Sequence, residues 1–110
     1  MERVNERVDI IKVFEYVIQN IMILNRKGKV EKVKVVLKND LIHIDIDDCI
    51  YTLSNVIMYR KFIDKISYKY KVLLKYMPLY DNLIMKEIAL LNYNNNQVTV
   101  VIKNKKLLIE

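Results

Sequence analysis

Hydrophobic residues recur with helical spacing near the start of the chain. Over residues 10–24 they stand three or four positions apart, which places them on one face of an α-helix at about 100° per residue. That apolar face consists of Ile10, Val13, Phe14, Val17, Ile18, Ile21 and Leu24. The opposite face is expected to hold Lys12, Glu15, Gln19 and Asn20. The helix should end within residues 26–29, because Gly28 can adopt the left-handed conformation that is common at helix C-termini.

The hydrophobic spacing changes to every second residue after this glycine. Apolar and polar residues alternate over residues 33–38 and again over residues 42–46. The intervening Asn39 and Asp40 suit a tight turn, because both residue types tolerate a positive φ at modest cost. The two runs therefore predict a β-hairpin with one apolar and one polar face.

The C-terminal tail repeats the hairpin pattern. Residues 98–104, Val-Thr-Val-Val-Ile-Lys-Asn, correspond one by one to residues 33–39, Val-Lys-Val-Val-Leu-Lys-Asn. The apolar segments upstream also match if two residues are gapped. The pattern favours an internal repeat of two helix–hairpin units, over 8–46 and 79–110. Convergence is the alternative, because any half-buried hairpin with Lys outside and Val or Ile inside gives a similar string.

Between the two units, helical spacing explains more residues than local alternation does. A helix over residues 48–77 would gather apolar side chains on one arc and cations on the other. The apolar arc consists of Val56, Tyr59, Phe62, Ile63, Ile66, Tyr70, Leu73, Leu74 and Met77. Asp47 or Asp48 is expected to cap the start of this helix, and Pro78 to stop it. A shorter helix over residues 81–91 should follow.

These elements predict an α+β fold. Neither hairpin can bury its apolar face alone, so we expect a four-stranded antiparallel sheet packed on about three helices. A chain of 110 residues is long enough for a single domain, 1–110, and too short for two. Pairing of hairpins between two subunits is the alternative. Val36 and Val101 both interrupt the polar side of their hairpins, and such exceptions could mark a dimer interface.

Positive charge is concentrated on the predicted central helix. The chain carries 19 Lys and Arg and 13 Asp and Glu, and residues 51–76 hold six of the cations and one of the acids. The cations that share the polar arc are Arg60, Lys61, Lys65, Lys69, Lys71 and Lys75. Such a row suits the phosphates of DNA or RNA, and Tyr68 and Tyr76 beside it could stack on bases. A solvated or protein-facing surface is the alternative.

The residue types needed for catalysis are scarce. One Gly excludes phosphate-binding loops, and one Cys and one His exclude a disulfide framework and a Cys/His zinc site. His43, Asp45 and Asp47 could together ligate a metal, but a solvent-facing strand and a helix cap explain them without one. Cys49 is expected to be a small buried thiol. The sequence therefore predicts a non-enzymatic protein without metal or cofactor.

The expected location is the cytoplasm. The chain starts with charged residues rather than a secretory signal, and no apolar run approaches the roughly 20 residues that span a bilayer, so no membrane contact is expected. Heavy use of Ile, Lys, Asn and Tyr is typical of AT-rich genomes, such as those of some archaea and viruses.

Residues 32–66 place a hairpin, an acidic pair and a helix in an order that resembles part of the small dimerisation subunit of the KEOPS tRNA-modifying complex. The likeness covers about a third of the chain. The family has Asn-Ser and Arg-Trp on its helix and a clear leading strand, whereas this chain has Ser54-Asn55 and Arg60-Lys61 and lacks that strand. The resemblance implies an accessory subunit.

Two functional hypotheses follow. The leading one is a small basic protein that binds nucleic acid nonspecifically through the central helix. The alternative is a structural or regulatory subunit that contacts another protein or dimerises. Salt dependence separates the two, because phosphate contacts weaken steeply with salt and hydrophobic contacts do not.

Overall fold

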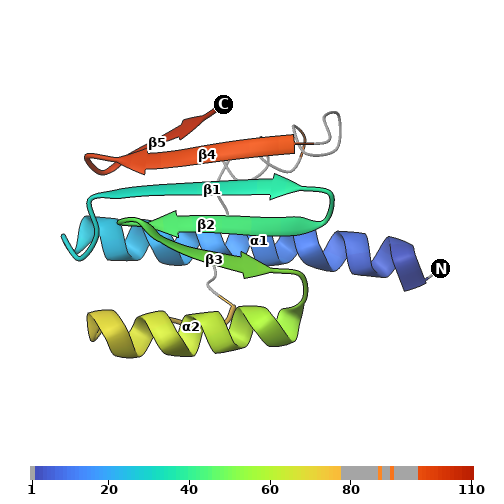
Figure 1. Ribbon diagram of the computed structural model, residues 1–110, viewed down its shortest axis with the longest axis horizontal. Coiled ribbons are helices and arrows are strands. Elements are labelled where there is room, and N and C mark those ends of the chain that lie inside the picture. The colour runs from blue at the N-terminus through green and yellow to red at the C-terminus, as the bar shows by residue number, and fades with distance from the viewer. Residues whose placement is uncertain (1, 78–86, 88–89, 91–96) are drawn as a thin grey trace.

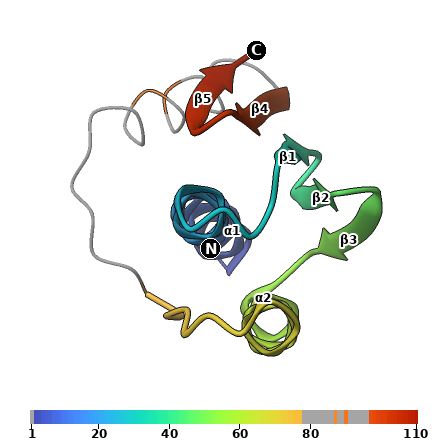
Figure 2. The same cartoon turned by 90° about the vertical axis from the view of Figure 1, so that its left-hand side faces the viewer.

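Five antiparallel strands form one sheet that curls around a long helix (Figures 1 and 2). The computed structural model describes residues 2–77, 87, 90 and 97–110. The helices are α1 (Glu2–Arg26) and α2 (Val56–Tyr70). The strands are β1 (Lys32–Lys38), β2 (Leu41–Ile46), β3 (Cys49–Leu53), β4 (Gln97–Lys103) and β5 (Lys106–Ile109). Their order in the sheet is β3-β2-β1-β4-β5.

Helix α1 lies against the concave face of the sheet, as Figure 2 shows. The seven apolar residues predicted for its inner face are all buried, so this prediction is confirmed. Two residues expected on the polar face, Gln19 and Asn20, are buried as well. The prediction that they face solvent was wrong. Asn20 is covered by α2 and the segment after it, where it contacts Tyr59 and Lys75. The helix ends at Arg26 as expected, with Gly28 at a φ of 70° and Lys29 N donating to the carbonyl of Leu24 at 2.9 Å.

The two predicted hairpins are present, and their first strands pair with each other. Strands β1 and β2 form one hairpin, β4 and β5 form the other, and β1 pairs with β4 around Val35 and Val100. Alternation points every second residue at α1, so that Ile44 and Val100 are fully buried. One core joins the sheet and both helices.

The prediction of four strands was wrong, because residues 49–53 form β3 rather than the start of a helix. Asp47 and Asp48 have φ angles of 47° and 73° and make a two-residue turn from β2 into β3. They do not cap a helix. The strand contains Ile, Tyr and Thr, which favour a pleated, half-buried position. Tyr51 pairs with Ile44 and packs edge-on against Phe62 of α2.

The central helix is shorter than the predicted 48–77. Its true cap is Asn55, whose side chain accepts a hydrogen bond from Met58 N at 2.8 Å. Lys71 takes a left-handed conformation with a φ of 56° and ends the helix long before Pro78. The chain is non-helical after it, so Leu74 is buried whereas Leu73 is 91% exposed. Met77 is exposed as well, contrary to prediction.

Two helices are thus seen in the described part of the chain, where about three were predicted. The helix expected over residues 81–91 lies outside the described residues, apart from 87 and 90. No described helix is long and apolar enough to span a membrane.

Leucine truncation tests the end of α2. Leu74→Ala should lower the free energy of unfolding by about 2–3 kcal/mol, because it removes buried apolar atoms. Leu73→Ala should change it by less than about 0.5 kcal/mol, because that side chain faces solvent. Urea denaturation followed by circular dichroism measures both. Equal losses of stability in the two variants would contradict the non-helical segment after Lys71 and favour the longer helix, which buries both leucines.

Candidate nucleic-acid interface

The cations predicted as a nucleic-acid site lie on α2 and on the segment that follows it. Arg60, Lys61, Lys65 and Lys69 are on the helix, and all four are exposed. Lys61, Lys65 and Lys69 stand four residues apart, so they form a row along one side of α2 with about 6 Å between successive Cα atoms along the axis. Lys71 and Lys75, also exposed, lie beyond the helix end. The predicted single row is therefore divided into two parts.

Packing on the opposite side of α2 fixes this orientation. Tyr59, Phe62, Ile63 and Ile66 are buried against α1 and the sheet. Turning the helix to hide the lysines would expose these four side chains, at a cost of about 1.5–3 kcal/mol for each. The row of lysines is therefore held outward by the core.

Three of the exposed cations make cation–π contacts with tyrosine rings. In each pair the charged group lies 5.4 Å from the centroid of a ring. The pairs are Arg60 with Tyr76, Lys65 with Tyr51 and Lys69 with Tyr70. Cation–π contact restrains a long side chain but leaves its positive charge in place. None of the α2 cations makes an ion pair with a carboxylate among the residues that the structure describes.

A buried polar network ties the segment after α2 to both helices. Asn20 Nδ2 lies 3.1 Å from the Tyr59 hydroxyl and 3.0 Å from the carbonyl of Lys75. The Tyr59 hydroxyl in turn donates to the carbonyl of Tyr76 at 2.8 Å. Burial raises the pKa of Tyr59 above its ordinary value. This network was not predicted from the sequence, because helical spacing assigned Asn20 to the solvent.

The two tyrosines predicted to stack on bases differ in accessibility. Tyr68 is 88% exposed at the edge of the lysine row. Tyr76 donates its hydroxyl to Asp64, and this hydrogen bond raises the pKa of Tyr76. Its ring also lies under Arg60. Tyr68 is therefore the better candidate for stacking on a base, whereas Tyr76 is already in contact with Asp64 and Arg60.

The predicted interface residues Val36 and Val101 come together on the convex face of the sheet. Val36 pairs with Thr99 and Val101 pairs with Lys34, so the two valines are diagonal neighbours on β1 and β4. Leu108 of β5 pairs with Val101 and is exposed. Neither α1 nor α2 covers this face (Figure 2).

The residues considered for metal binding have other partners. His43 Nδ1 lies 3.3 Å from Thr52 Oγ1 on the convex face, and the Asp45 carboxylate accepts from Asp48 N at 3.1 Å. Within the described residues no three His, Cys, Asp or Glu side chains lie close enough to share a metal ion. Cys49 is exposed on β3 rather than buried, with its Sγ 3.6 Å from Lys69 Nζ.

A second concentration of positive charge was missed by the sequence analysis. Residues 26–32 and 103–106 meet at the end of the sheet where α1 stops, and we call them the basic end. They carry seven cations and one acid. The cations are Arg26, Lys27, Lys29, Lys32, Lys103, Lys105 and Lys106. In Figure 1 the C-terminus of α2 lies at this same end of the molecule.

Comparison with protein-family models, with curated proteins and with solved structures finds no match for this chain.

Removing the Tyr59 hydroxyl tests the polar network. Tyr59→Phe should cost about 1–2 kcal/mol at pH 7, because Asn20 and the carbonyl of Tyr76 lose their partner. Unfolded tyrosine ionises near pH 10, whereas folded Tyr59 keeps its proton to higher pH, so this contribution should diminish as the pH rises above 10.

Urea denaturation from pH 8 to pH 11 measures this effect. The stability gap between the wild type and Tyr59→Phe should narrow above pH 10, by up to about 1.4 kcal/mol per pH unit. Tyr68→Phe is the control, because Tyr68 is exposed and should show no such gap. A constant gap would contradict the shifted pKa.

Proposed function

We propose that the protein is a small non-enzymatic protein that binds DNA or RNA nonspecifically through the cations of α2. The observation that carries the proposal is the row of Lys61, Lys65 and Lys69, which is exposed and makes no ion pair within the described residues. Unpaired cations attract a polyanion, and each phosphate contact releases condensed counterions.

Rigidity of the row supports this proposal. Lys65 and Lys69 lie over tyrosine rings, and the helix is fixed by four buried side chains. A restrained side chain loses less conformational entropy when it binds a phosphate. The row consists of lysines and lacks the Asn, Gln and Arg side chains that commonly read base edges. We therefore expect contacts to the nucleic-acid backbone that do not depend on the nucleotide sequence. A cytoplasmic location and an archaeal or viral origin stay predictions from the sequence.

A charge-matched pair of triple variants tests the proposal. Lys61→Gln, Lys65→Gln and Lys69→Gln together should weaken binding of a labelled single strand by about tenfold or more at low salt. They should also reduce the slope of log K against log salt by about 2, at roughly 0.7 for each lost phosphate contact. Fluorescence anisotropy at several salt concentrations measures both.

The control carries Lys12→Gln, Lys34→Gln and Lys38→Gln, which remove the same charge from α1 and β1. This variant should lose much less affinity and keep its slope. Both triples should fold, because their side chains are exposed. Equal losses in the two triples would contradict a site on α2, and no binding by the wild type even at low salt would reject the function.

The alternative is a homodimer formed through the convex face of the sheet. The diagonal contact of Val36 with Val101, and the exposure of Leu108 beside them, favour this second candidate. Stable interfaces have an apolar centre of this kind, ringed by polar residues. A dimerisation role would fit an accessory subunit of a larger complex.

Sedimentation velocity tests the homodimer. The wild type should sediment as a dimer at concentrations of about 100 μM, and Val101→Lys should sediment as a monomer, because it places a charge at the centre of the interface. Lys12→Gln, on the far side of the sheet, is the control and should leave the dimer intact. A monomeric wild type would exclude this alternative.

A further inference from the structure

Three lysines stand directly opposite one another at the basic end. Lys32 of β1 pairs in register with Lys103 of β4, which pairs in turn with Lys106 of β5. Like charges in opposed positions of an antiparallel sheet repel each other and lower stability. No carboxylate forms an ion pair with this row among the residues that the structure describes. The row is therefore an unfavourable arrangement unless an anion binds to it.

The turn next to this row contains an unfavourable residue. Lys105 has a φ of 63° and occupies the second position of the two-residue turn between β4 and β5. Asp40 and Asp48 occupy this position in the other two hairpin turns, with φ angles of 61° and 73°. Gly, Asn and Asp tolerate this left-handed conformation better than Lys does. A strained residue kept at such a position points to a function for its side chain.

A cleft of about 540 Å³ opens beside these lysines. It lies between the loop after α1 and the β4–β5 turn, and Lys32, Lys103 and Lys105 all line it. The other lining residues are Asn25, Gly28, Val30, Glu31 and Asn104. The volume falls within the roughly 300–1,000 Å³ of small-molecule sites. Three lysines thus border a space that is large enough for a ligand.

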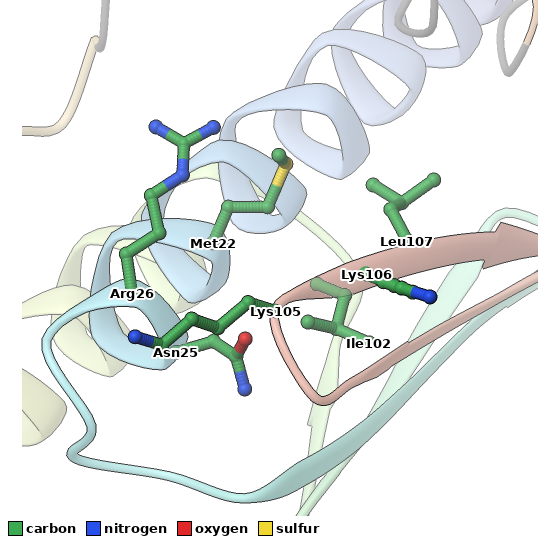
Figure 3. A pocket seen from close by; sticks show the side chains of 7 residues that line it. All are labelled: Met22, Asn25, Arg26, Ile102, Lys105, Lys106 and Leu107. Carbon is green, nitrogen blue, oxygen red and sulfur yellow. The ribbon is translucent and has the colours of Figure 1, made fainter.

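Asn25 fixes one wall of this cleft. Its Nδ2 donates to the carbonyl of Val30 at 3.2 Å, which holds the loop against the end of α1. Its Oδ1 is buried and accepts no hydrogen bond from the described residues. Figure 3 shows a neighbouring pocket that shares Asn25 and Lys105 with this cleft, and in it Lys105 extends from the turn toward the end of α1, whereas Lys106 points the other way. Charge repulsion and backbone strain meet beside this wall, and such local departures are typical of functional sites.

We propose that this cleft is a phosphate-binding site, in which Lys32, Lys103 and Lys105 contact the oxygens of a polyphosphate or of a nucleic-acid backbone. Phosphate oxygens accept strong charge-assisted hydrogen bonds from ammonium groups. Bound negative charge would also relieve the repulsion along the lysine row. Glu31 and the carbonyl end of α1 oppose an anion here, and so do the three aspartates around the β2–β3 turn, of which Asp47 lies 3.5 Å from Lys32 N. The seven cations of the basic end outnumber these four acids. The site does not involve α2 and so goes beyond the function proposed above.

Thermal stabilisation by sodium tripolyphosphate tests the site. Ligand on the order of 10 mM should raise the Tm of the wild-type chain by at least about 4 °C over sodium chloride of equal ionic strength. Lys103→Gln and Lys105→Gly should each lose most of this rise and weaken the apparent affinity about tenfold. Without ligand, Lys105→Gly should be at least as stable as the wild type, because glycine removes the strain.

Lys38→Gln is the matched control. Lys38 pairs with Gln97 at the other end of the β1–β4 ladder, where the equivalent row of lysines is missing. This variant should keep the full rise in Tm. Equal rises in Lys38→Gln and Lys103→Gln, or no rise in the wild type beyond that in sodium chloride, would overturn the proposal. A ligand-free Lys105→Gly variant that is less stable than the wild type would count against it.

A labelled single strand of about 20 nucleotides identifies the source of the phosphate. If Lys103→Gln weakens binding of both tripolyphosphate and the strand, the site supports nucleic-acid binding. If it weakens only tripolyphosphate binding, the ligand class is a free polyphosphate compound. Tripolyphosphate binding does not require the α2 row. The triple variant on α2 and the Lys103→Gln variant therefore test the two proposals independently.

Discussion

Burial of the apolar face of α1 is the interaction on which the rest of the structure depends. Phe14, Ile18 and Ile21 are fully buried. The concave face of the sheet covers one side of the helix, and α2 with the segment after it covers another. Each fully buried side chain of this size contributes about 1.5–3 kcal/mol. Because every element turns its apolar side toward α1, the lysines of α2 and the valines of the convex face are left outside.

The sequence predicts the parts of the fold in which one spacing persists, and it fails where a residue type has two uses. The alternation in both hairpins and the apolar face of α1 were predicted from hydrophobic spacing alone. Asp47 and Asp48 are as good in a helix cap as in a tight turn, so β3 was taken for the start of a helix. Lys71 ends α2 by taking a left-handed conformation that lysine rarely adopts, and nothing in its identity signals this.

Site prediction was limited by reading charge along the chain. The central segment has a large excess of cations within 26 residues, so it stands out in the sequence. The basic end does not, because its cations come from residues 26–32 and 103–106, and acids in the flanking sequence nearly balance each group. Pairing of Lys32 with Lys103 brings the two groups together. Of the flanking acids, Asp47 lies beside Lys32 at this end, whereas Asp40 lies at the opposite end of β1. A site made by long-range strand pairing has no local signal.

The central pairing of Val35 with Val100 relates the two hairpins by an approximate twofold axis. Three residue differences break this symmetry in the same sense. At the offset that matches the hairpins, Gln97 stands in place of Lys32, Asp40 in place of Lys105 and Leu41 in place of Lys106. All three differences put a lysine at the basic end and a neutral or acidic residue at the other. Turn geometry gives no reason for this bias, because both turns have the same backbone geometry and lysine is the poorer turn residue. The proposed phosphate ligand would account for it.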